Sequence, residues 1–103
     1  MHMPDDLSNG TTNDQQIRAV IREFILQKLL AGEEAINLTD ATPLVSGGII
    51  DSMNALKVGL FLEKSFGIKL APEQLADPEN LETVVAIASL VESEMARQEG
   101  ARE

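Results

Sequence analysis

Apolar residues recur at steps of three and four along two stretches of the chain, a spacing that places them on one face of an α-helix. In the first stretch this stripe comprises Ile17, Val20, Ile21, Phe24, Ile25 and Leu29. Thr12 followed by Gln15 fits a capping box, so we expect this helix to begin near Asn13 and to end at Gly32. The second stretch predicts a last helix that begins near residues 81–83. Its stripe comprises Val84, Ile87, Ala88, Val91 and Met95, flanked by Val85 and Leu90.

Two further helices are predicted between these stretches. A helix over 52–66 has Asp51 as a candidate cap, and Gly67 follows it where a left-handed residue commonly ends a helix. Residues 72–75 begin with proline and form a short helical turn. Gly59 lies inside the longer helix at a cost of about 1 kcal/mol relative to alanine, for which close approach of another helix is one compensation.

A long loop is predicted over 32–48, where the helical pattern breaks down. Leu38, Leu44 and Val45 are isolated apolar residues among Thr, Asp, Pro and Gly, and they are expected to hold the loop against the core. The pattern therefore predicts an all-α fold. We expect a small four-helix bundle of three long helices and one short one, with this loop between the first two.

Length and composition limit the possible folds and chemistries. The chain has 103 residues, enough for one domain at 13–97, with a disordered lead at 1–12 and a frayed tail at 98–103. Aromatic residues are only 3% of the chain and cysteine is absent, which excludes disulfides, thiolate metal sites and thiol catalysis. The lone histidine, His2, lies in a start-like or cloning-remnant context. Because neither a serine–histidine pair nor a carboxylate pair can be assembled, we expect no enzyme and no metal site.

The charge balance bears on partners and location. The net charge is −9, from 17 acidic and 8 basic residues. Such a surface repels nucleic acid and anionic lipid and favours basic protein partners, although solubility alone is the plainer explanation. No apolar run approaches the ~20 residues of a membrane span. No basic start precedes an apolar segment, so a cytoplasmic protein is expected.

The helix at 52–66 is preceded by a distinctive stretch, Leu44-Val45-Ser46-Gly47-Gly48-Ile49-Ile50-Asp51-Ser52-Met53. Ser52 thereby lies at a helix N-terminus, where unpaired N–H groups and the dipole favour an anion such as a phosphate ester. The alternative is that Asp51 or Ser52 only caps the helix. Gly47 and Gly48 either let the loop swing for partner access or serve turn geometry alone.

This stretch, with the spacing of Val58, Leu62 and Phe66 and the ending Glu63-Lys64-Ser65-Phe66-Gly67-Ile68, resembles the acyl carrier protein family. That family includes the peptidyl and aminoacyl carriers, and the resemblance extends roughly over residues 14–95. It implies that Ser52 carries a 4′-phosphopantetheine arm, which a separate phosphopantetheinyl transferase adds from coenzyme A. It also implies that cargo is held as a thioester on the arm's terminal thiol. Asp51 is then expected to assist the metal-dependent step of the transferase.

A docking surface for partners is predicted on the helix that follows Ser52. Its residues are Met53, Leu56, Lys57, Leu60, Glu63 and Lys64. The better core candidates of that helix are Val58, Phe61, Leu62 and Phe66. If these face inward, the apolar members of the first set form an exposed strip; the alternative is that all of them are buried. The mixed charge of the surface departs from the strongly acidic second helix of many fatty-acid carriers.

The residues and the resemblance together predict a free-standing, monomeric carrier of a biosynthetic pathway, of polyketide, nonribosomal peptide or related specialised metabolism. Expected partners are the phosphopantetheinyl transferase, an acyl- or aminoacyl-loading ligase or acyltransferase, and a downstream synthase or transferase. Three alternatives remain open. They are an aminoacyl carrier of cell-envelope type loaded by an adenylating ligase, a domain excised from a larger synthase, and an unmodified helical interaction domain.

Overall fold

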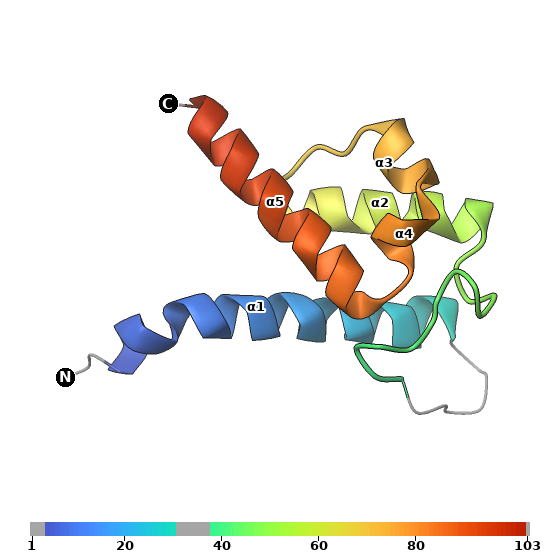
Figure 1. Ribbon diagram of the computed structural model, residues 1–103, viewed down its shortest axis with the longest axis horizontal. Helices are drawn as coiled ribbons and strands as arrows, with labels where there is room; N and C mark the ends of the chain where they lie inside the picture. Colours follow the sequence, from blue (N-terminus) through green and yellow to red (C-terminus); the bar gives the residue numbers. More distant parts are fainter. Residues whose placement is uncertain (1–3, 31–37, 103) are drawn as a thin grey trace.

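The computed structural model describes residues 4–30 and 38–102 (Figure 1), and within these ranges the chain is helical with no strand. The long helices are α1 (Pro4–Phe24), α2 (Ser52–Phe66) and α5 (Val84–Arg102). A π-helical turn, η1 (Ile25–Leu29), continues α1, and the short helices are α3 (Pro72–Ala76) and α4 (Pro78–Leu81). The predicted all-α fold is confirmed. None of the described helices is long and apolar enough to cross a bilayer.

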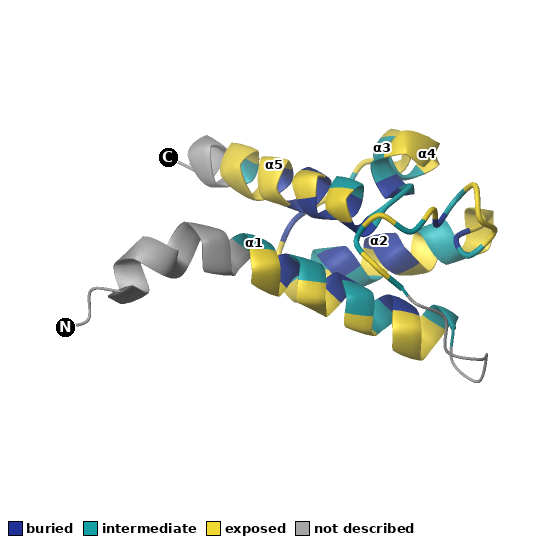
Figure 2. Cartoon of the chain, turned by 60° about the horizontal axis from the view of Figure 1, so that its bottom comes forward, coloured by how far each residue is buried: buried dark blue, intermediate teal, exposed yellow. Residues whose placement is uncertain are grey.

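The core lies where α5 crosses obliquely over α1 and α2 (Figure 1). Figure 2 shows that the buried positions of these helices face one another, while their outer faces are exposed. The largest fully enclosed side chains are all aliphatic: Ile21, Ile25, Leu44, Leu62, Leu81, Ile87, Val58, Val84 and Val91. The predicted stripes are confirmed in the main, except that Val20, Val85 and Met95 are exposed at the edges of the core.

The described residues near both ends of the chain are more helical than the sequence predicted. Residues 4–12, assigned to a disordered lead, belong to α1, so the predicted start near Asn13 is wrong. A proline at the first helical position, followed by Asp5 and Asp6, is a favourable helix start that the absence of an apolar stripe concealed. At the other end α5 runs to Arg102, through most of the tail predicted to fray. Residues 96–102 are mainly Ala, Arg, Gln and Glu, which are strong helix formers.

The segment between α2 and α5 contains two short helices where the sequence predicted one. Helix α3 is the predicted turn, and α4 is an addition that also begins with a proline. Asp77 separates them and caps α4, because its carboxylate accepts a hydrogen bond from the N–H of Glu79 at 3.0 Å. The next helix is capped similarly, since the hydroxyl of Thr83 accepts from the N–H of Ala86 at 3.0 Å.

The described part of the first loop, from residue 38 onward, packs against the core as expected. Leu44 is fully buried, and Leu38 and Val45 are half-buried against the same cluster. The N–H of Leu44 donates to the carbonyl of Glu82 at 2.7 Å, which joins the loop to the start of α5. The carbonyl of Leu44 accepts from the N–H groups of Ile49 and Ile50, at 2.8 and 2.9 Å.

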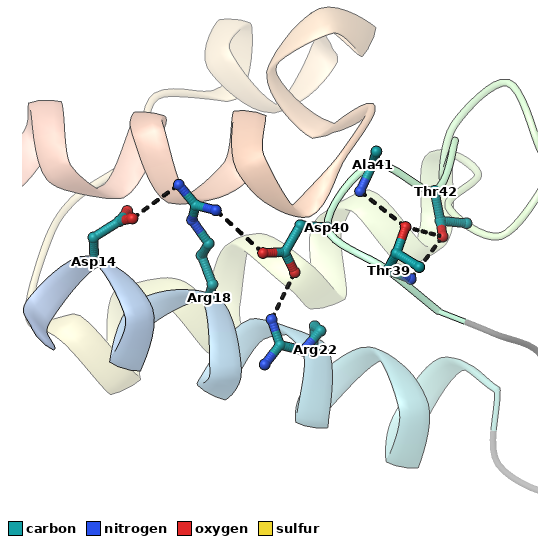
Figure 3. A network of polar contacts seen from close by, with 7 residues as sticks. All are labelled: Asp14, Arg18, Arg22, Thr39, Asp40, Ala41 and Thr42. Carbon is teal, nitrogen blue, oxygen red and sulfur yellow. Dashed lines mark hydrogen bonds and ion pairs between the residues drawn. The ribbon is translucent and has the colours of Figure 1, made fainter. Parts of the chain in front are cut away.

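A second anchor holds the loop to α1 (Figure 3). The carboxylate of Asp40 contacts Arg18 at 3.2 Å and Arg22 at 2.6 Å, and Arg18 also pairs with Asp14 at 2.8 Å. Burial alone would raise the pKa of Asp40, but the hydrogen bonds from Arg22 and Arg18 outweigh it and hold the pKa below its ordinary value. The carbonyl of Asp40 accepts from the N–H of Val85 at 3.2 Å, so this residue joins α1 to α5.

Candidate functional site

At the N-terminus of α2, the neighbouring residues Asp51 and Ser52 differ in their hydrogen bonding. Asp51 is extended, with φ −101° and ψ −170°, and its carboxylate accepts a hydrogen bond from the N–H of Asn54 at 2.8 Å. Asp51 is therefore the helix cap, as predicted. Ser52 is the first residue of α2 and is exposed, and its hydroxyl forms no hydrogen bond with any described residue. The serine oxygen therefore lies exposed at a helix N-terminus, an end whose N–H groups and dipole favour an anion.

The carboxylate of Glu82 is a further anchor of the loop that leads into Ser52. Glu82 accepts from the N–H of Val45 at 3.2 Å, from the N–H of Ser46 at 2.9 Å, and from the Ser46 hydroxyl. The hydrogen bond from the Ser46 side chain, followed by the bond from its backbone, holds the pKa of Glu82 below its ordinary value. The sequence did not single out Glu82. Its partners lie 36 and 37 residues away, so no local signal identifies this role.

The two glycines before Ser52 meet conformational requirements of this loop. Gly48 has φ +85°, a left-handed backbone conformation that residues other than glycine adopt at a cost in free energy. At Gly47 a Cβ atom would overlap the carbonyl oxygen of Pro43. The backbone conformation of Gly48 and the close contact at Gly47 account for both glycines through turn geometry, one of the two interpretations that the sequence left open.

A cavity of about 680 Å³ opens beside Ser52, between α2 on one side and α3 and α4 on the other. Its lining is apolar except at the Asp51–Ser52 end: Val45, Gly48, Ile50, Asp51, Ser52, Ala55, Leu56, Pro72, Leu75, Ala76, Pro78 and Leu81. This volume is within the range of small-molecule sites. The sequence did not predict the cavity, because its walls come from two separate stretches of the chain, residues 45–56 and 72–81.

Helix α3, one wall of this cavity, is held close to α2 and to α5. A Cβ atom at Gly59 would overlap the side chain of Leu75, so the glycine permits the close approach that the sequence suggested as compensation. Gln74 donates to the carboxylate of Glu94 at 2.8 Å, and Glu94 also accepts from Gln98 at 2.8 Å and pairs with Arg97 at 2.6 Å. Glu94 is only 4% exposed. The bond from Gln98 is the main cause that lowers its pKa, against the opposing effect of burial.

The residues predicted to face partners lie mostly on the exposed side of α2. Met53, Leu56 and Leu60 are 64%, 58% and 67% exposed, so the alternative in which all of them are buried is wrong. Val58 and Leu62 are buried and Phe61 and Phe66 are half-buried, as expected for core candidates.

The charged members of the predicted surface differ in their surroundings. Lys57 and Lys64 are exposed. Glu63 is half-buried, and its carboxylate accepts from the N–H of Leu70 at 2.8 Å, so it is already engaged with the segment after α2.

The described side chains contain no group of three or more acidic, histidine or cysteine residues able to hold a metal ion. We then compared the sequence with known proteins. No family model and no curated protein matches it significantly. A function must therefore be inferred from the geometry around Ser52, where a free hydroxyl, a helix N-terminus and an apolar cavity meet.

Proposed function

We propose that this chain is a carrier protein that holds an acyl or aminoacyl group on a 4′-phosphopantetheine arm attached to Ser52. The observation that supports it best is the division of roles at the start of α2. Asp51 caps the helix, so the exposed Ser52 hydroxyl is left without a structural task. A phosphodiester at this position would lie at the positive end of the helix dipole.

The residues around Ser52 fit such a group. The exposed hydroxyl leaves room for a transferase to approach, and the adjacent cavity of about 680 Å³ offers apolar walls for an arm or for an apolar cargo. When attached, the arm supplies a terminal thiol that carries the cargo as a thioester, which this chain cannot provide without cysteine. The protein itself contributes positioning, because tethering raises the effective concentration of the cargo near a partner enzyme.

Attachment of the arm requires one substitution reaction at phosphorus. The Ser52 oxygen forms a bond to the pantetheine-side phosphorus of coenzyme A, and the bond to the bridging oxygen of the diphosphate breaks. The bisphosphorylated adenosine half leaves, and the hydroxyl proton passes to a base of the transferase. We assign Asp51 a role in orienting this step, since its carboxylate is fixed by the N–H of Asn54 directly beside the reacting residue.

Within this proposal the helices form a four-helix carrier bundle, in which α3 and α4 together serve as the short helix. The protein acts as a cytoplasmic monomer in polyketide, nonribosomal peptide or related metabolism, where a ligase or acyltransferase loads it and a synthase or transferase unloads it. The exposed lysines on α2 favour this setting over general fatty-acid synthesis, because the docking helix lacks a uniformly acidic surface.

The proposal is tested by intact-mass measurement before and after incubation with coenzyme A and a broad-specificity phosphopantetheinyl transferase. We expect a gain equal to one phosphopantetheine group, which Ser52→Ala abolishes. Ser65→Ala is the matched control, because Ser65 is also exposed on α2 but lies at its far end. A gain that survives Ser52→Ala would contradict the assignment of the site. No gain in the unaltered protein would favour the second candidate, an unmodified helical interaction domain.

A further inference from the structure

A shallow hollow between η1 and α2 collects three of the chain's eight basic residues. Its volume is about 400 Å³, and its lining comprises Phe24, Lys28, Lys57, Leu60, Phe61 and Lys64. We call it the lysine hollow. The rings of Phe24 and Phe61 are stacked, with centroids 4.1 Å apart and planes inclined by 19°. The hollow therefore combines an aromatic floor with a rim of three exposed ammonium groups.

The charge of this rim stands out against the rest of the molecule, whose net charge is −9. Arg18, Arg22 and Arg97 form ion pairs with carboxylates. Among the side chains that the structure describes, Lys57 and Lys64 form none. Like charges gathered on one face without acidic partners raise the local potential and favour an anionic ligand surface.

The apolar part of the hollow continues onto an exposed strip of α2. Leu60 is 67% exposed at its edge, and Leu56 and Met53 extend the strip toward Ser52. Apolar residues on an exposed helix face, flanked by charge along one side, match the groove that an amphipathic helix recognises. A phosphate or nucleotide alone would leave this strip uncovered, so the surface fits a protein segment better than a small anion.

We propose that the lysine hollow docks an acidic amphipathic helix of a partner protein. The apolar side chains of that helix seat on Leu60 and the Phe24–Phe61 pair, and its carboxylates pair with Lys28, Lys57 and Lys64. The hollow lies five to twelve residues along α2 from Ser52, which is about 7–18 Å at the helical rise. A segment bound there leaves Ser52 accessible, so the inference goes beyond the proposed function and does not require a modified serine.

Two synthetic helical peptides test this inference against the full-length, isotope-labelled protein. Both carry the same leucine stripe, but one has glutamates along its edge and the other has lysines at the same positions. We expect the glutamate-edged peptide to shift the amide NMR signals of residues 24–29 and 57–64, and the lysine-edged peptide to bind more weakly. Adding salt should weaken the first complex, because exposed ion pairs are screened.

Charge reversal at two of the lysines tests whether the rim binds the peptide. The double variant Lys57→Glu/Lys64→Glu is expected to bind the glutamate-edged peptide roughly tenfold more weakly. Lys69→Glu is the matched control, because Lys69 is exposed but lies outside the hollow. Equal binding of both peptides, or an equal loss in the control, would overturn the proposal. So would shifts of the same signals that appear with rising protein concentration alone, since a second copy of the chain would then occupy the hollow.

These experiments separate the inference from the assignment of Ser52. The peptide titration is repeated on Ser52→Ala, which cannot be modified, and we expect unchanged affinity. If the peptide fails to bind while the mass gain occurs, the docking inference is wrong and the carrier proposal stands. If the peptide binds but no mass gain occurs, the docking inference stands and the carrier proposal is wrong.

Discussion

At the start of α2, two neighbouring polar residues differ in their hydrogen bonding. Asp51 satisfies the N–H of Asn54, whereas the Ser52 hydroxyl contributes no hydrogen bond to any described residue. A cap and a reactive group are often confused in sequence, because both are short polar residues at a helix start. Here the structure assigns the cap to the aspartate.

This difference in hydrogen bonding predicts that substitutions at Asp51 and at Ser52 change the free energy of unfolding by different amounts. Asp51→Ala is expected to lower the free energy of unfolding by about 1 kcal/mol through loss of the cap. Ser52→Ala is expected to change it by less than about 0.5 kcal/mol, because an exposed side chain without partners is removed. Urea unfolding of both variants measures the difference. If Ser52→Ala proves as destabilising as Asp51→Ala, the serine has a structural role and the division described here is incorrect.

At the scale of elements, the described part of the loop before α2, from residue 38 onward, is anchored in the core. Leu44 is fully buried, and its backbone N–H and carbonyl are both bonded. We therefore expect Leu44→Ala to lower the free energy of unfolding by about 2–5 kcal/mol, the range for a buried leucine. Leu60→Ala, at a 67% exposed position, is the control and should change it by less than about 0.5 kcal/mol. Equal effects in denaturant unfolding would mean that the loop does not pack as described.

Some elements were predictable from sequence because their signals are local. Asp51 and Gly67 delimit α2 as expected, and Gly67 has the left-handed φ of +66° that favours glycine after a helix. Helix α4 was missed because four residues are too few to show an apolar period. The N-terminal half of α1 was missed because its residues bear no apolar stripe, although proline and acidic residues favour a helix start there.

The parts of the site that the sequence did not predict depend on distant contacts. Asp40 meets Arg18 and Arg22 across 22 and 18 residues, and no pattern of spacing indicates that pairing. The cavity beside Ser52 likewise requires α3 to be placed against α2, which depends on the fit of Leu75 over Gly59. The helix start at Ser52 and its Asp51 cap could be predicted from neighbouring residues, but the surroundings of the serine could not.

At the scale of the whole molecule, hydrogen-bonded carboxylates join the helices and the loop to one another, so the free energy of unfolding should depend on pH. The pKa values of Asp40, Glu82 and Glu94 are lower in the folded chain than their ordinary values. The unfolded chain then binds protons more readily. The stabilisation is fully present above the ordinary carboxyl pKa of about 4 and is lost as pH falls through the lower folded values. Unfolding free energy measured across the acid range should therefore decrease toward low pH.

Two substitutions separate the contributions to this pH dependence. Glu82→Gln should make the decrease shallower, because the residue whose pKa is lowered by Ser46 no longer titrates. Glu92 has the opposite sign, since its hydrogen bond with Asp14, and then burial, raises its pKa. Glu92→Gln should therefore increase stability at neutral pH and not at acid pH. A parallel shift of both variants at all pH values would contradict these assignments.

The stacked rings of Phe24 and Phe61 have an optical consequence. The chain contains neither tryptophan nor tyrosine and only three phenylalanines, so near-ultraviolet absorption comes from very few chromophores. Two of them lie face to face at the junction of α1 and α2, where coupled rings held in one orientation produce circular dichroism. Separation of the two helices should reduce that signal even if every helix stays intact. The protein thus contains an intrinsic spectroscopic reporter of whether the lysine hollow is intact.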